Sequence, residues 1–186
     1  MRARRREYRA ARAFLDRLQP PVLAVPGNHD ITPFRLLERF LDPLARWRRH
    51  IAEQVEPLFH DEEIAVVGIN TASRAGTLFD WSRGRVRRSD LARAVDRLRS
   101  LPPGLFRIVV AHHPFLPPES APDMPLVRRA EAALAVFARE DVRLVLSGHL
   151  HLGFIRARGS AADAARAGGA AGSGVGSLLV VQAATA

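Results

Sequence analysis

The stretch LVLSGHLH, residues 144–151, says most about how this chain folds. Its opening residues, Leu144–Leu146, form a short apolar run, which is typical of a strand buried in a sheet. A polar turn follows, and His149 and His151 stand in it two positions apart. The stretch therefore predicts a buried strand whose C-terminal end presents two imidazole side chains.

The same pattern occurs twice more in the chain. IVVA at residues 108–111 leads into HHP at 112–114, and VLAV at 22–25 leads into PGNHD at 26–30. Five of the seven histidines fall in these three motifs. Because ligands of α/β sheets bind at the carboxyl ends of the strands, we expect the three motifs to converge at one edge of a sheet.

Helical patterns separate the predicted strands. Apolar spacing or composition predicts helices over residues 7–18, 34–58 (with a break at Pro43), 89–101 (with Ser89 as N-cap) and 125–139, and further strands over 64–69 and 178–182. The Gly- and Ala-rich residues from about 156 to 177 have no periodicity and predict a flexible loop. With 186 residues and this alternation, we expect a single domain over residues 1–186.

The composition limits the metal chemistry that is available. The chain has no cysteine, so a metal site must use His, Asn, Asp or Glu. Such ligands suit hard or borderline ions such as Mn, Fe, Zn or Mg. The lack of cysteine and of any run of 18 apolar residues agrees with a cytoplasmic protein that has no membrane span.

The net charge of +9 comes entirely from arginine and has two readings. A basic protein attracts phosphate groups or nucleic acid. Alternatively, the arginines reflect a biased composition spread over solvated helix faces. Their scatter along the sequence favours the second reading and argues against a nucleic-acid partner.

The motif residues suggest particular chemical roles. Two histidines two apart, such as His149 and His151, can each serve one of two neighbouring metals, and Asn28 offers a neutral carbonyl oxygen. His29 beside it can stay off the metal and act as an acid, with Asp30 orienting its ring, although Asp30 also suits a helix N-cap.

Two polar residues near these motifs have more ordinary readings. His113 reads as a neighbour of the ligand His112 rather than as a ligand. Asn70 either lines the site or, more simply, makes a turn after its strand.

Taken together, GNHD, HHP and GHLH resemble the motifs of the calcineurin-like metallophosphoesterase superfamily, and within it the branch of cyclic-nucleotide and phosphodiester hydrolases. The resemblance implies an α+β fold: a four-layer α/β/β/α sandwich of two mixed β-sheets with a binuclear centre at the strand ends. It implies two divalent metal ions in a complete enzyme. Asn28, His112 and His149 resemble ligands of the second metal, His151 a ligand of the first, and His29 and Asp30 the catalytic histidine and its partner.

The sequence departs from the superfamily pattern before Asn28. The Asp-x-His and Gly-Asp motifs, which supply the remaining ligands and the bridging carboxylate, do not occur there. We therefore expect a sandwich that is incomplete at its N-terminal strands.

The resemblance implies hydrolysis of phosphodiester or phosphomonoester bonds by attack of a metal-bound hydroxide. The expected substrate is a small phosphoester, with cyclic nucleotides as candidates, and a homodimer is a candidate assembly. Two alternatives stay open. One is a catalytically impaired remnant that acts as a binding module, and the other is a nuclease of the same superfamily.

Overall fold

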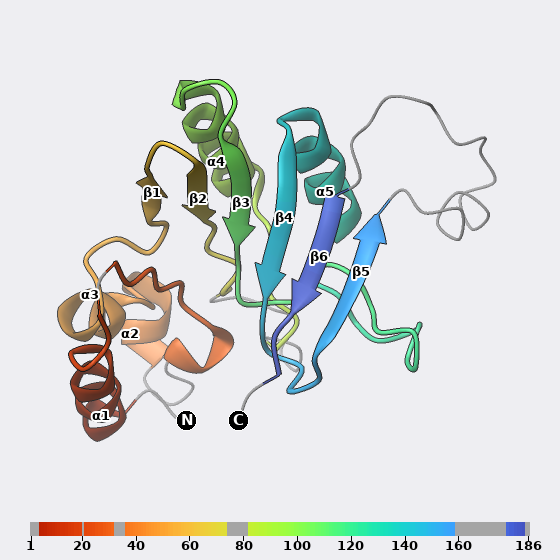
Figure 1. The fold of residues 1–186 in the computed structure, drawn as a ribbon. Helices are drawn as coiled ribbons and strands as arrows, with labels where there is room; N and C mark the ends of the chain where they lie inside the picture. The colour runs from red at the N-terminus through yellow and green to blue at the C-terminus, as the bar shows by residue number, and fades with distance from the viewer. Residues whose placement is uncertain (1–3, 20, 32–35, 74–81, 159–177, 185–186) are drawn as a thin grey trace.

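The computed structural model describes residues 4–19, 21–31, 36–73, 82–158 and 178–184. Its centre is a six-stranded sheet in the order β1-β2-β3-β4-β6-β5 (Figure 1). The strands are β1 (Leu58–His60), β2 (Ile64–Gly68), β3 (Phe106–Val110), β4 (Val142–Ser147), β5 (Phe154–Arg158) and β6 (Leu178–Gln182).

The sheet is mixed. Strands β2, β3, β4 and β6 run parallel to one another, and the edge strands β1 and β5 pair antiparallel to their neighbours. The carboxyl ends of the four parallel strands therefore meet at one edge, which is the lower edge in Figure 1. Helices and a mixed sheet confirm the expected α+β fold class.

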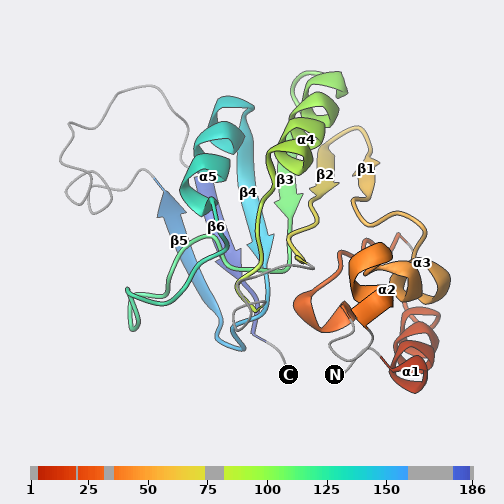
Figure 2. The same cartoon turned by 180° about the vertical axis from the view of Figure 1, so that it is seen from behind.

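Two helices cover one face of the sheet (Figures 1 and 2). They are α4 (Arg88–Ser100) and α5 (Ala130–Arg139). The main core lies between these helices and the strands and includes Ala94, Leu98, Leu134 and Phe137 from the helices and Val67, Val109, Val145 and Val180 from the strands. Full burial of one large apolar side chain stabilises the fold by about 1.5–3 kcal/mol.

The opposite face of the sheet is also apolar. The strand register places Val66, Ile108, Leu144 and Leu179 in one row across it, and Leu179 is 37% exposed. Figures 1 and 2 show helices on the other face only, among the described residues. Since parallel strands are normally buried on both faces, this surface suits the second sheet of the expected sandwich, which remains a prediction.

The N-terminal part forms a small second core beside the carboxyl edge of the sheet. Helices α1 (Arg5–Leu15), α2 (Leu36–Leu41) and α3 (Ala45–His50) lie there together with the 3-10 turn η1 (Asn28–Asp30). The buried residues of this core are Tyr8, Ile31, Leu44, Trp47 and Ala72. The Tyr8 hydroxyl donates a hydrogen bond of 2.9 Å to the backbone oxygen of Asp30, so α1 holds the η1 turn in place.

Several predicted elements differ from the structure. The run 22–25 forms no strand, because no neighbouring strand in the described chain pairs with it. Ser89 lies inside α4, and Arg87 is the N-cap. Residues 34–58 were expected to be helical, but α3 ends at His50 and Leu58 begins β1, so strand β1 was missed.

The predicted flexible loop from 156 to 177 also needs a correction. Residues 156–158 belong to β5, an edge strand that pairs antiparallel with β6. The rest of that segment, 159–177, lies outside the described residues. The last predicted strand, 178–182, has the bounds of β6.

Candidate metal centre

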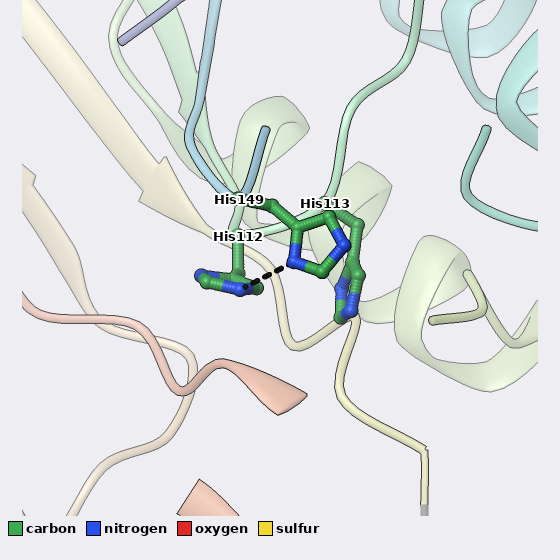
Figure 3. Close-up of side chains that lie close together, drawn as sticks. All are labelled: His112, His113 and His149. Atoms are coloured by element: carbon green, nitrogen blue, oxygen red, sulfur yellow. Dashed lines mark hydrogen bonds between the residues drawn. The ribbon is translucent and has the colours of Figure 1, made fainter. Parts of the chain in front are cut away.

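The ends of β3 and β4 bring His112 and His149 together. The backbone hydrogen bonds between the two strands continue beyond their ends. The Ala111 N–H donates to the backbone oxygen of Leu146, and the Gly148 N–H donates to that of His112, both at 3.0 Å. His112 Nε2 and His149 Nδ1 consequently lie 3.2 Å apart (Figure 3). The HHP and GHLH motifs, whose residues His112 and His149 are 37 positions apart in sequence, therefore lie next to each other.

The η1 turn adds Asn28 to the pair. Its side-chain oxygen Oδ1 lies 3.1 Å from His112 Nε2, and the residue is buried. Gly27 makes this approach feasible, because a Cβ atom at that position would lie 2.7–2.9 Å from three atoms of the His112 ring. The glycine of the GNHD motif therefore has a steric reason in this structure.

The loop after β4 has an unusual backbone. His149 and His151 have φ angles of 84° and 56°, a backbone region that residues other than glycine seldom adopt. Gln182 of β6 supports this loop, since it accepts a 2.8 Å hydrogen bond from the Ser147 hydroxyl and donates one to the Gly148 oxygen. Strained backbone of this kind concentrates at functional sites, where the surrounding structure maintains it.

Burial favours the neutral forms of the two contacting imidazoles. Burial lowers the pKa of His112 to about 4, with smaller contributions from His149, His29 and His151. Burial also lowers the pKa of His149, followed by the charges of His29 and His151. A neutral ring keeps a nitrogen lone pair that can bind a metal ion.

His113 is the third imidazole of the cluster, and the sequence predicted it as a neighbour of the ligand His112 rather than as a ligand. It is fully buried, and its metal-binding nitrogen lies with those of His112 and His149 in a group within 4.8 Å of one another. Burial, ahead of the neighbouring His112 and His149, lowers its pKa to about 2.

The catalytic candidates lie at the same edge. His29 is exposed and lies close enough to influence the pKa values of His112 and His149. The Asp30 carboxylate accepts a 2.8 Å hydrogen bond from the Gly27 N–H, and burial raises its pKa. This contact stabilises the turn from its last residue, so Asp30 is not the N-cap, which is Gly27. The action of Asp30 on His29 remains a prediction.

Two further polar residues occupy different places. His151 is exposed, and its charge also influences His112 and His149, so it lies near the centre. Asn70 is buried, and its side-chain oxygen accepts a hydrogen bond from the Ala72 N–H at 3.0 Å. This contact agrees with the prediction that Asn70 makes a turn after its strand.

The cluster fits a divalent ion. Two ligand atoms that each lie about 2.0–2.1 Å from a tetrahedral ion are separated by about 3.3 Å. The distances of 3.2 Å from His112 Nε2 to His149 Nδ1 and 3.1 Å to Asn28 Oδ1 are close to that value. Two imidazoles suit a borderline ion such as Zn²⁺, and the amide oxygen also suits a harder ion such as Mn²⁺.

One comparison with known proteins identifies a family for this chain. The model of the calcineurin-like phosphoesterase family matches residues 3–153, which is most of the chain and includes all three motifs. A search of curated proteins finds no match to the sequence.

In the part of the chain that the structure describes, no helix has the length and apolar character needed to cross a membrane.

Proposed function

Because the chain belongs to the calcineurin-like phosphoesterase family, we propose that it hydrolyses phosphodiester or phosphomonoester bonds at the cluster formed by Asn28, His112 and His149. The family comprises metal-dependent phosphoesterases, and the histidine cluster is compatible with that activity. The observation that carries the proposal is the shared contact of His112 Nε2 with Asn28 Oδ1 and His149 Nδ1.

In this proposal the three side chains hold one divalent ion. His151 would be a ligand of a second ion only where the Asp-x-His and Gly-Asp motifs supply the remaining ligands, as in a complete enzyme of the superfamily. A bound divalent ion would lower the pKa of water and offset the charge that develops on the phosphate. Burial favours the neutral forms of His112 and His149, so both rings are ready to bind without first losing a proton. The backbone hydrogen bond from Gly148 holds His112, and the loop that Gln182 supports holds His149.

His29 is proposed to give a proton to the leaving alcohol. It is exposed beside the cluster, on the turn that also carries Asn28, so it can reach a substrate that lies over the ligands. Its neighbour Asp30 holds that turn through the Gly27 N–H. General acid catalysis of this kind contributes about 10²–10⁴-fold to the rate.

The substrate is proposed to be a small phosphoester, with cyclic nucleotides as the first candidates to assay. A cytoplasmic location, a homodimer and the absence of a nucleic-acid partner stay predictions from the sequence.

The proposal is tested by hydrolysis of an aryl phosphodiester and an aryl phosphomonoester with Mn²⁺, Zn²⁺ or Mg²⁺ added to metal-free protein. We expect turnover that requires the ion, that a chelator abolishes, and that falls at least about 100-fold in His149→Ala. His60→Ala is the matched control, because His60 is an exposed residue of β1. Turnover that survives His149→Ala or the chelator contradicts the proposal, and metal binding without turnover favours the binding-module alternative.

A further inference from the structure

His113 is held through its backbone N–H and its ring nitrogen Nδ1, although the proposed reaction does not use it. The Thr71 hydroxyl oxygen accepts the His113 backbone N–H at 3.3 Å and lies 2.8 Å from the ring nitrogen Nδ1. Both residues are fully buried. Thr71 therefore fixes both the backbone and the ring of His113.

The backbone of Gly84 also contacts the His113 ring. A Cβ atom on Gly84 would lie 2.4–2.6 Å from Nδ1, Cγ and Cε1 of His113, so the glycine backbone lies directly against that ring. The φ angle of Gly84 is +65°, which glycine adopts without strain. The next residue, Arg85, donates its backbone N–H to the backbone oxygen of Thr71 at 2.9 Å, so this segment is held beside Thr71.

The two proposed ligand rings pack on the ring that is held in this way. The His113 centroid lies 4.8 Å from that of His112, edge to face at 88°, and 4.9 Å from that of His149, at 46°. The His112 and His149 centroids are 5.1 Å apart, so the three rings contact one another (Figure 3). Because Thr71 and Gly84 both contact the His113 ring, that ring restricts the orientations open to its two neighbours.

We propose that Thr71, His113 and Gly84 form a strut that fixes the ring orientations of His112 and His149 and thereby sets the affinity and geometry of the metal site. His113 is then a positioning residue and not a ligand. The inference rests on the ligand set given under Proposed function. Groups that orient metal ligands typically contribute a factor of 10–100 to metal affinity.

The test is a titration of metal-free protein with Co²⁺, followed by its visible absorption spectrum. Thr71→Val keeps the shape of the side chain and removes the hydroxyl, whereas Thr71→Ser keeps the hydroxyl and is the matched control. We expect Thr71→Ser to bind like the wild type. We expect Thr71→Val to bind Co²⁺ about 10–100-fold more weakly, with a changed spectrum, when only folded protein is counted.

A lower unfolding midpoint in Thr71→Val, together with wild-type Co²⁺ affinity and spectrum, would show that Thr71 has only a structural role, and would overturn the inference. Nitrogen-15 spectra of the wild-type histidine rings give a second measurement that needs no variant. On addition of Zn²⁺ the ring nitrogens of His112 and His149 should shift to metal-bound values and those of His113 should not. A metal-bound His113 nitrogen also overturns the inference.

The outcomes separate this inference from the proposed function. If the wild-type chain binds no Co²⁺, the proposed metal site fails and the strut fails with it. If the wild type binds Co²⁺ and His112→Ala does not, while Thr71→Val binds like the wild type, the result contradicts the strut inference and leaves the proposed metal site standing.

Discussion

At the scale of single residues, the site depends on neutral, preorganised side chains. His112 Nε2 faces both Asn28 Oδ1 and His149 Nδ1 at 3.1–3.2 Å, although Asn28 and His112 are 84 positions apart. Burial maintains the neutral imidazoles, and the turn at Gly27 brings the amide oxygen to them. Each residue therefore contributes a ligand atom whose position the fold has already fixed.

His29 should matter for rate and not for metal binding. In His29→Ala we expect hydrolysis to fall about 10²–10⁴-fold, because the leaving alcohol loses its proton donor. Metal content, measured alongside by elemental analysis, should stay at the wild-type level, whereas Asn28→Ala should lose metal. If metal and rate fall in step in His29→Ala, the residue is a ligand, and an unchanged rate removes it from the mechanism.

The depressed pKa of His112 predicts acid sensitivity of the metal-free protein. Between the ordinary pKa of 6.5 and the folded value of about 4, the unfolded chain binds a proton on this ring and the folded chain does not. The free energy of unfolding should therefore fall as the pH drops through this window, by about 3 kcal/mol for this group at about 1.4 kcal/mol per pKa unit. Urea unfolding at pH 7, 5 and 4 measures this loss, and His112→Asn should lose less; equal losses would contradict the assignment.

At the scale of elements, the sequence predicted the parts of the site that depend on strand ends. Residues 108–111 and 144–146 overlap β3 and β4, and the motifs behind them meet because those strands are parallel neighbours. The contribution of His113 could not be predicted, because it depends on contacts with Thr71 and Gly84, 42 and 29 positions away in sequence. The run 22–25 has strand-like composition, but composition alone supplies no pairing partner.

The two glycines that flank the cluster should respond differently to a methyl group. Gly27→Ala places Cβ 2.7–2.9 Å from the His112 ring, so the ring or the η1 turn must move. In Gly148→Ala the nearest atom is the His112 backbone oxygen at 3.8 Å, an ordinary contact. We expect Zn²⁺ affinity, measured by calorimetry, to fall at least about 10-fold in Gly27→Ala and to change little in Gly148→Ala. Equal affinities would show that the turn tolerates the displacement.

At the scale of the whole molecule, the fold holds the site through one well-packed face of the sheet. Helices α4 and α5 cover that face, while the opposite face presents apolar residues that the described chain leaves partly exposed. The resemblance to the superfamily implied the α+β fold class, whereas the pattern of strands and helices predicted that the motifs meet at one edge of a sheet. The second sheet is a prediction from family resemblance, since no periodicity in the sequence tells which element covers a sheet face.

The stability of the fold should depend most on the face of the sheet that α4 and α5 cover. Phe137 of α5 is fully buried and packs against Phe115 with ring centroids 6.0 Å apart. Phe137→Ala should lower the free energy of unfolding by about 3–5 kcal/mol, whereas Phe40→Ala, at a residue that is 54% exposed, should change it by less than about 1 kcal/mol. Denaturant unfolding of both variants provides the comparison. A similar loss in both would mean that α5 does not anchor the main core.

The most direct test of the account is a crystal structure of the chain with Zn²⁺, in which anomalous scattering locates the ion. The account predicts an ion about 2.0–2.2 Å from Asn28 Oδ1, His112 Nε2 and His149 Nδ1, with His113 still bonded to Thr71. An ion that is held by His113 or bound away from the three motifs would contradict it, as would the absence of an ion when Zn²⁺ is saturating.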